Sequence, residues 1–283
     1  MKITVTGVKG QLGYDVMKVL HQRGDDAVGV DIDDFDITDS SAVLSFLESG
    51  RPDAVIHCSA YTAVDRAEEN EKLCRAVNVD GTCNIAAACK KIGAKMVFLS
   101  TDYVFEGTGT QAHEVDDKKA PPNVYGRSKL EGEDAVRKIL ARHFIVRTSW
   151  VFGKNGNNFV KTMLRLGKQG GEINVVNDQV GSPTYTADLA PLLRDMIDTE
   201  KFGTYHATNQ GYCSWADFAM EIFRQAGYPT KVNFVPSSLY PTKAKRPLNS
   251  RLSKKSIEKA GFHLLPAWQN ALARYLKEIK ELP

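Results

Sequence analysis

A tyrosine and a lysine lie four residues apart in the segment Tyr125-Gly126-Arg127-Ser128-Lys129. On a helix, side chains at this spacing share one face. A free phenol has a pKa of about 10, which is too high for efficient proton transfer near neutral pH. A neighbouring ammonium stabilises the phenolate and lowers that pKa. The spacing therefore indicates a proton-transfer pair, although ordinary surface pairs share it.

A hydroxyl group is needed beside this pair to orient a substrate oxygen. The segment Ser100-Thr101-Asp102 follows an apolar run, residues 95–99, that is predicted to be a strand. Ligands of open parallel sheets bind beyond the carboxyl ends of their strands. We therefore select Thr101 as the third catalytic residue, with Tyr125 and Lys129. A hydrogen-bonded turn at the strand end is the competing interpretation.

Glycines with the spacing GxxGxxG separate a predicted strand, residues 2–6, from a predicted helix, residues 11–22. A tight turn needs the conformational freedom of glycine, and the helix N-terminus offers free N–H groups to a diphosphate. This context favours a dinucleotide site over an ordinary turn. Tyr125 and Lys129 are expected to contact the same cofactor, with Lys129 on the nicotinamide ribose. The predicted loop contacts are Gly7, Lys9, Gly10, Gln11, Leu12 and Gly13.

An acidic residue, Asp31, ends the second predicted strand about 20 residues after the glycine loop, where a carboxylate can bind the adenosine ribose. A carboxylate repels a 2′-phosphate, which favours NADH, whereas Lys9 offsets part of that repulsion and leaves NADPH open. The alternative is a solvated acid at a strand end. Asp36 and Ile37 are expected near the adenine, and Asp39 is expected to cap a helix.

Strand and helix patterns alternate through the first half of the chain. Strands are predicted at residues 27–30, 53–57, 95–99 and 144–147, and helices at 39–47, 71–91 and 125–140. The alternation predicts an α/β fold with a doubly wound parallel sheet of the Rossmann type. We assign residues 1–150 to a dinucleotide-binding domain and residues 151–283 mainly to a smaller α/β substrate-binding part. Later segments are free to return to the first domain.

The composition excludes several classes of protein. The 283 residues carry a net charge of +3 without a concentrated basic surface, so no nucleic acid is expected. The five cysteines contain no CxxC motif, and neither a disulfide framework nor a metal site is predicted. No segment resembles a signal peptide or a membrane span. These features predict a cytoplasmic protein without a membrane partner.

The glycine loop, the segment 100–105 and the Tyr-Gly-Arg-Ser-Lys segment together resemble the extended short-chain dehydrogenase/reductase family. Four further blocks are similar to its dTDP-4-dehydrorhamnose reductases, and the resemblance covers nearly the whole chain. These blocks are Ala60-Tyr61-Thr62-Ala63-Val64-Asp65, residues 147–153, residues 177–184 and Arg246-Pro247.

This resemblance implies an oxidoreductase that transfers hydride from NADPH or NADH to the C4 ketone of dTDP-4-dehydro-L-rhamnose. The product, dTDP-L-rhamnose, supplies cell-surface polysaccharide biosynthesis. Thr101, Tyr125 and Lys129 are carried over as catalytic, and Ser59, Ala60 and Tyr61 as cofactor contacts. The implied substrate contacts are Thr101, Asp102, Tyr103, Trp150, Gln179, Lys245 and Arg246, the last two as donors to the diphosphate.

Two departures from the family pattern stand out. Cys58 and Ser59 occupy the place where an asparagine usually precedes the Ala-Tyr-Thr block, which affects a cofactor contact. Some members dimerise around magnesium held by glutamates, whereas the matching positions here hold Asp15 and Ala187. The sequence therefore leaves a homodimer open, and no metal is predicted.

Other functions on this fold compete with the reductase. A 4,6-dehydratase requires a glutamate where this chain has Tyr103, which argues against dehydration. A different nucleotide-sugar reductase or a 4-epimerase stays open, and an epimerase would retain its cofactor through purification. A non-catalytic, dinucleotide-binding regulatory subunit is the alternative from another class, and it would not need Thr101, Tyr125 and Lys129 together.

Overall fold

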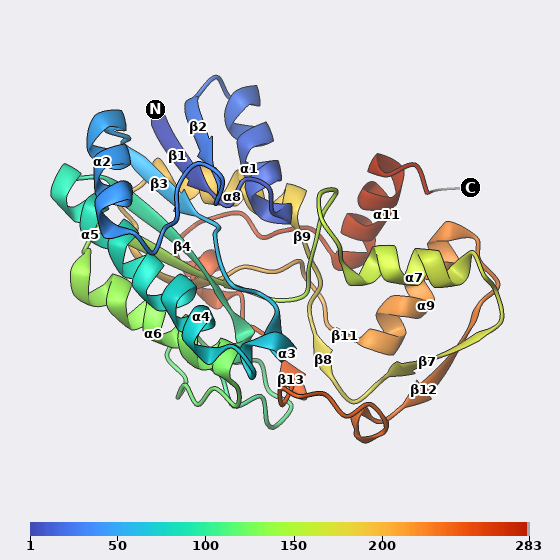
Figure 1. Cartoon of the computed structure of the whole chain (residues 1–283). Coiled ribbons are helices and arrows are strands. Elements are labelled where there is room, and N and C mark those ends of the chain that lie inside the picture. The colour runs from blue at the N-terminus through green and yellow to red at the C-terminus, as the bar shows by residue number, and fades with distance from the viewer. Residues whose placement is uncertain (282–283) are drawn as a thin grey trace.

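A six-stranded parallel sheet forms the centre of the larger part of the chain (Figure 1). The protein is represented by a computed structural model, which describes residues 1–281. The strand order β2-β1-β3-β4-β5-β10 confirms the predicted doubly wound sheet. The strands are β1 (Lys2–Thr6), β2 (Asp26–Val30), β3 (Ala54–His57), β4 (Lys95–Thr101), β5 (His143–Thr148) and β10 (Gly203–His206).

Helices cover both faces of this sheet because successive side chains of each buried strand point to opposite sides. In β5, Phe144 and Val146 join one apolar layer and Ile145 joins the other. The first layer contains α1 (Gln11–Gln22), α8 (Thr186–Ile197) and α10 (Lys255–Lys259). The second contains α2 (Ser40–Gly50), α5 (Thr82–Ile92) and α6 (Val124–Ile139). Within residues 1–281, no helix is both long and apolar enough to cross a bilayer.

The single helix predicted for residues 71–91 is wrong in detail. The structure divides it into α4 (Glu71–Arg75), a π-helical turn η1 (Ala76–Gly81) and α5, after the short α3 (Val64–Ala67). Asn78, within the π-helical turn, accepts a hydrogen bond from the Tyr61 backbone N–H at 2.8 Å. Such turns are rare and occur often at functional sites. Apolar periodicity alone does not distinguish this turn from an α-helix.

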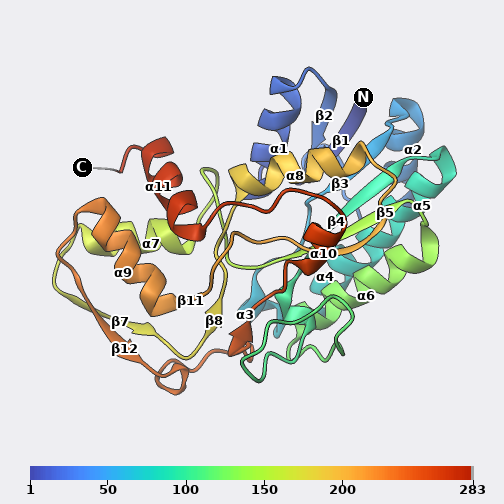
Figure 2. The same cartoon turned by 180° about the vertical axis from the view of Figure 1, so that it is seen from behind.

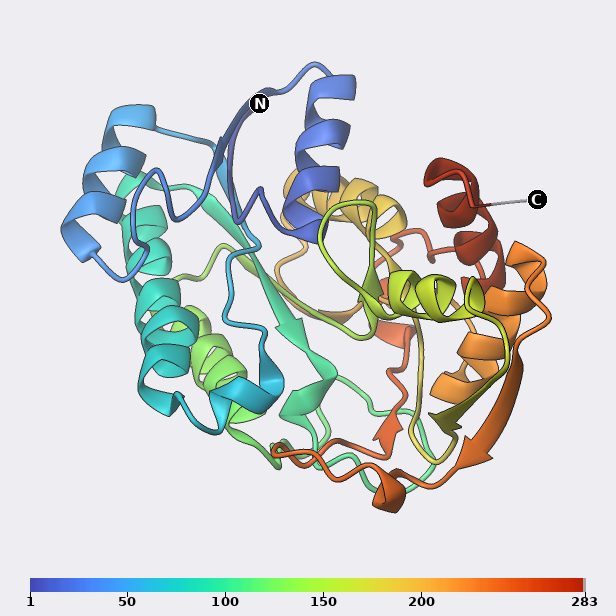
Figure 3. The same ribbon diagram turned by 45° about the vertical axis from the view of Figure 1, so that its right-hand side comes forward.

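The smaller part packs three helices around its own apolar core. These are α7 (Phe159–Gly167), α9 (Trp215–Ala226) and α11 (Trp268–Glu278), which gather on one side of the molecule in Figure 3. Short strands accompany them: β6 (Val151–Phe152), β7 (Glu172–Val176), β8 (Val180–Gly181), β9 (Thr184–Tyr185), β11 (Cys213–Ser214), β12 (Lys231–Val235) and β13 (Asn249–Ser250). The 3-10 turns are η2 (Asp102–Val104) and η3 (Ser237–Leu239).

The chain passes between the two parts more than once. After β9, α8 packs against α1, as the view from behind in Figure 2 shows, and β10 then pairs with β5 at the edge of the large sheet. Helix α8 and strand β10 therefore belong to the layers of the large sheet, although both follow residue 150. The domain boundary at residue 150 stays a prediction.

A buried ion pair joins α6 to the sheet beneath the candidate site. Glu133 and Arg147 are both fully buried, and the guanidinium donates to both carboxylate oxygens, at 2.8 and 2.7 Å. The Ser100 hydroxyl donates to the same carboxylate at 2.6 Å, which ties the end of β4 to α6. Arg137 also bonds this carboxylate, but from a half-buried position. The Glu133 carboxylate therefore ties α6 to both β5, through Arg147, and β4, through Ser100, and so holds together the two elements that carry the predicted catalytic residues.

We expect Arg147→Met to lower the free energy of unfolding by about 3–5 kcal/mol, because Glu133 is left as a buried charge. Arg137→Met is the matched control and should cost about 1 kcal/mol or less, since that side chain is partly solvated. The double variant Glu133→Leu/Arg147→Met should recover most of the loss. Urea unfolding of the four proteins measures these differences. Equal losses in the two arginine variants would contradict this role of the pair.

Candidate active site

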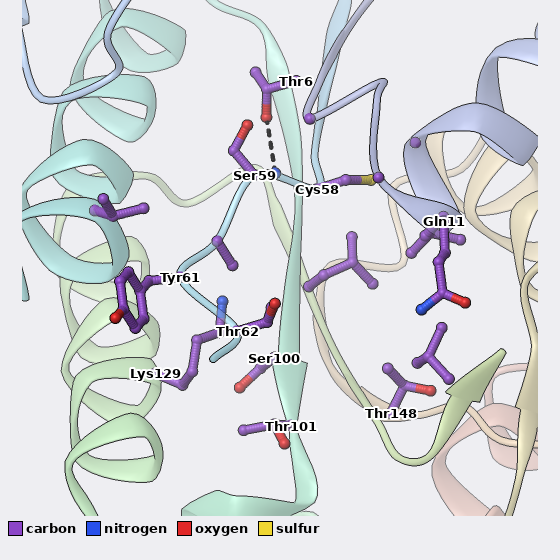
Figure 4. Close-up of a pocket in the computed structure, with 18 of the residues that line it drawn as sticks. Thr6, Gln11, Cys58, Ser59, Tyr61, Thr62, Ser100, Thr101, Lys129 and Thr148 are labelled. Atoms are coloured by element: carbon purple, nitrogen blue, oxygen red, sulfur yellow. Dashed lines mark hydrogen bonds between the residues drawn. The ribbon is translucent and has the colours of Figure 1, made fainter. Parts of the chain in front are cut away.

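One cavity of about 750 Å³ lies at the carboxyl ends of β1, β3, β4 and β5. From β1 the chain passes to β2 on one side and then to β3 on the other, so the topology reverses between β1 and β3. Ligands of such sheets bind at this reversal. Figure 4 shows Ser100, Thr101 and Lys129 extending into one space from β4 and α6. The cavity therefore joins the glycine loop to all three predicted catalytic residues.

The loop after β1 brings bare backbone to the cavity. Gly7 has a φ of +73°, and a Cβ there would lie 2.7 Å from the Ser59 backbone nitrogen. Helix α1 begins after Gly10 without a side-chain cap, so its first N–H groups are available to an anion. This cradle fits a dinucleotide diphosphate. Every predicted loop residue lines the cavity, namely Gly7, Lys9, Gly10, Gln11, Leu12 and Gly13.

Asp31 lies at the expected place, at the end of β2 in the cavity wall. Its two carboxylate oxygens accept from the backbone N–H groups of Lys9, at 2.8 Å, and Ile32, at 2.9 Å. The Lys9 ammonium forms an exposed ion pair with Asp33. Asp36 and Ile37 line the same end of the cavity. Negative charge therefore surrounds the position that an adenosine ribose would take.

The segment after β3 is held in place by Asn78. Its amide accepts from the Tyr61 N–H and donates to the Tyr61 carbonyl at 3.1 Å. It also donates to the Ser128 hydroxyl of α6 at 2.9 Å. The predicted cofactor residues Ser59, Ala60 and Tyr61 all line the cavity.

Helix α6 supplies the phenol and the ammonium. Asn123 caps the helix by accepting the Gly126 N–H at 2.8 Å. Gly126 lies against the Tyr103 carbonyl, where a Cβ would overlap that oxygen, so the first turn approaches η2 closely. Tyr125 and Lys129 then both reach the cavity, as their spacing predicts. The Lys129 Nζ is 4.1 Å from the centre of the Phe98 ring, in cation–π geometry.

Thr101 ends β4 and is buried. Its hydroxyl donates to Asp102 Oδ1 at 2.9 Å and accepts the Tyr103 N–H at 3.2 Å. The nearby Thr101 hydroxyl acts to lower the pKa of the Tyr125 phenol. The predicted catalytic set is therefore brought together, with the hydroxyl oriented by its own strand end.

Burial dominates the proton affinities of the pair. Burial raises the pKa of Tyr125 above its ordinary value of 10, and Asp102 and Tyr103 raise it further. The pKa of Tyr125 is therefore raised overall, and the lowering expected from the spacing to Lys129 does not prevail over burial. Burial also lowers the pKa of Lys129 from 10.5 to about 8, against the opposing effect of Glu133. The phenol thus holds its proton at neutral pH, while the ammonium is close to losing one.

Two of the predicted substrate contacts, Asp102 and Tyr103, line the cavity. Burial raises the pKa of Asp102 to about 6. The Tyr103 ring meets the Tyr125 ring edge-on at 5.6 Å, and its hydroxyl accepts from Arg246 at 3.2 Å. Arg246 also forms an ion pair with Asp65 at 2.6 Å. Arg246 therefore stands at the rim, bonded to a cavity residue, without lining the cavity itself.

Of the remaining predicted substrate contacts, one lines the cavity and two do not. Trp150 lines the cavity just beyond β5. Gln179 is buried beside β8, and Lys245 is exposed, with its backbone carbonyl accepting from Asn123 at 2.9 Å. Neither residue lines the cavity. The segment that carries Lys245 is nevertheless bound to the N-cap of α6, which places it next to the candidate site.

Sequence reasoning missed three residues that support the site. Asn78 and Glu133 lie within helical segments. The available signal was that each is a polar residue on the predicted apolar face of its helix. Trp215 stacks on Trp150 with ring centres 3.6 Å apart and planes within 12° of parallel, and nothing in the local pattern connects these two residues. All three act through side-chain contacts between distant segments.

Comparison with known proteins agrees with this geometry. The sequence model of the family described as "RmlD substrate binding domain" matches residues 1–281. The spore coat polysaccharide biosynthesis protein SpsK of Bacillus subtilis is 39% identical, over 98% of this chain and 97% of that protein. The dTDP-4-dehydrorhamnose reductase of Escherichia coli K12 is also 39% identical, over 99% and 98%.

A solved structure is equally similar. The dTDP-4-dehydrorhamnose reductase of Bacillus anthracis, determined in complex with NADP, is 42% identical and superimposes with a TM-score of 0.96. The match covers 98% of this chain and 100% of that one. The resemblance stated from the sequence motifs is therefore confirmed, and the chain belongs to the RmlD substrate binding domain family of extended short-chain reductases.

Proposed function

We propose that this protein reduces the C4 ketone of dTDP-4-dehydro-L-rhamnose to dTDP-L-rhamnose, with NADPH or NADH as the hydride donor. The observation that carries the proposal is the single cavity in which a dinucleotide cradle meets Thr101, Tyr125 and Lys129. Family membership and the named activity of the relatives support the choice of a dTDP-sugar. The cytoplasmic location and a homodimer stay predictions from the sequence.

The glycine loop and Asp31 would hold the dinucleotide, which when bound would supply the hydride for the carbonyl carbon. Tyr125 donates its proton to the oxygen that gains charge, and its raised pKa keeps that proton available at neutral pH. Lys129 offers a buried positive charge that favours the phenolate left after transfer. Its cationic form is thus the active one.

Thr101 orients the ketone oxygen, and this requires a change of hydrogen bonding. A hydroxyl has one proton, and here that proton is directed to Asp102. Donation to the substrate therefore means that Thr101 releases Asp102. Burial raises the pKa of Asp102 to about 6, so this carboxyl group takes up a proton more readily than an ordinary aspartate does.

Tyr125→Phe should lower kcat by about 10²–10⁴-fold, because the general acid is lost. The binding of NADPH should stay nearly unchanged. Tyr103→Phe is the matched control, since it removes a neighbouring phenol that does not donate a proton to the substrate in this mechanism. This variant should mainly raise KM. Steady-state kinetics with enzymatically prepared dTDP-4-dehydro-L-rhamnose and a cofactor titration measure both. Wild-type kcat in Tyr125→Phe would refute the tyrosine role.

The pH profile should report Lys129. Its pKa of about 8 predicts that kcat/KM falls as the pH rises through about 8, since the neutral amine no longer stabilises the phenolate. Tyr125 loses its proton only at higher pH, so it does not produce this decrease. Lys129→Arg, although less active, should move the decrease to higher pH because a guanidinium stays charged. A profile that stays level to pH of about 10 would contradict the requirement for the cation.

The acidic end of the cavity should make NADH the preferred donor. Asp31→Ser should raise kcat/KM for NADPH relative to NADH by about tenfold, because repulsion of the 2′-phosphate is removed. Asp33→Asn should also raise the NADPH preference, because it releases the Lys9 ammonium from its ion pair. Lys9→Met should lower the NADPH preference, because it removes that positive charge. Asp26→Asn, an equal charge change at the far end of β2, is the control. If the ratio of kcat/KM for NADPH to that for NADH rose equally in all three aspartate variants, net charge alone would explain it and this account would be contradicted.

A further inference from the structure

Trp150 has an unusual backbone conformation. Its φ is +49°, in the left-handed region, which a bulky side chain rarely adopts because it is strained there. The residue lies between β5 and β6, and its carbonyl accepts the Thr184 N–H at 3.1 Å. Thr148, two residues earlier, is the register partner of Thr101. The strained residue therefore follows the strand that flanks the catalytic hydroxyl.

Two residues of the smaller part form a cradle for the Trp150 ring. Trp215, the first residue of α9, stacks on it face to face at 3.6 Å. Gly181 of β8 lies beside it, and a Cβ at that glycine would be 2.9 Å both from Trp150 Cε2 and from the Ser250 Cβ. The φ of Gly181 is not positive, so the backbone does not require glycine here. The absence of a side chain at Gly181 therefore leaves room for the Trp150 ring and for Ser250 of the paired strand β13.

Trp215 is itself firmly placed. Its ring lies 4.6 Å from that of Phe159, centre to centre, and Phe218 contacts it from the same helix. Ser214 and Asp217 form a capping box that fixes the start of α9. Trp150 lines the cavity, whereas Trp215 does not. The smaller part thus contacts a residue of the cavity wall through the stack of Trp215 on Trp150.

We propose that Trp215 is a positioning residue, which with Gly181 holds the Trp150 ring against the apolar face of the sugar. The inference rests on the proposed function, since it assigns the sugar to the Trp150 side of the cavity. An indole face provides apolar contact and orientation for a hexose ring at little entropic cost. The strained backbone of Trp150 persists because the stack and the glycine space over-determine it.

Circular dichroism tests the stack without any turnover. Two stacked indoles give an exciton couplet in the far ultraviolet. We expect that couplet in the free protein and its loss in Trp150→Phe and in Trp215→Phe. Trp268→Phe is the matched control, because Trp268 lies in the same apolar core and packs against Phe218 instead. Saturating dTDP-L-rhamnose with NADP⁺ should change the couplet, whereas NADP⁺ alone should not.

Kinetics then separate positioning from simple stability. Trp215→Leu should raise KM for the keto-sugar about tenfold, with kcat lowered less than about threefold and NADPH affinity unchanged. Trp215→Phe should restore most of the loss, since it keeps an aromatic ring in the stack. Gly181→Ala, whose Cβ would crowd the Trp150 ring and Ser250 but does not replace Trp215, should reproduce the rise in KM. Trp268→Leu should reduce thermal stability and leave KM unchanged.

The proposal is overturned if Trp215→Leu changes KM no more than Trp268→Leu does, or if dTDP-L-rhamnose binds by calorimetry without altering the couplet. A wild-type protein that reduces no keto-sugar nucleotide refutes the proposed function instead. In that case the couplet and its response to dTDP-L-rhamnose still decide whether the tryptophan pair contacts the sugar.

Discussion

Helix α6 and the turn η2, which directly follows β4, approach each other so closely that Gly126 has no room for a Cβ beside the Tyr103 carbonyl. Gly132, six residues later, also lies against the π-helical turn, since a Cβ there would be 2.7 Å from the Asn78 carbonyl oxygen. The Ser100 hydroxyl joins β4 to the Glu133 carboxylate of α6, and Arg147 of β5 pairs with the same buried carboxylate. Because Thr101 comes from the strand and Tyr125 from the helix, this contact decides whether hydroxyl and phenol meet at all.

The same close packing controls the acid–base chemistry. Removal of water raises the pKa of a phenol and lowers that of an ammonium, so one effect moves Tyr125 and Lys129 in opposite directions. A reductase needs a phenol that arrives protonated and a cation that stabilises the phenolate once the proton has left. Burial supplies the first condition and weakens the second. Glu133, four residues along α6, opposes the loss of charge on Lys129.

The cavity is shared between the two parts of the chain, and the connections differ in chemistry. At the cofactor end, the Gln11 side chain accepts from the backbone N–H of Gly153 and from Asn158, both at 3.0 Å. At the opposite end, Arg246 reaches Asp65 and Tyr103, and Trp150 stacks on Trp215. Polar contacts thus join the parts near the glycine loop, and charge and aromatic contacts join them near the predicted sugar position.

The sequence by itself determined the parallel sheet, the glycine cradle, Asp31 and the Tyr125–Lys129 pair, because each is encoded within a few residues by periodicity, turn chemistry or helical spacing. Tertiary structure alone decided the direction of the Tyr125 pKa, the π-helical turn around Asn78 and the partners of Arg246. It also decided that Trp150 is held by Trp215 and Gly181. These features depend on burial and on contacts between segments distant along the chain, and no local pattern of residues records which distant side chain will fill a given space.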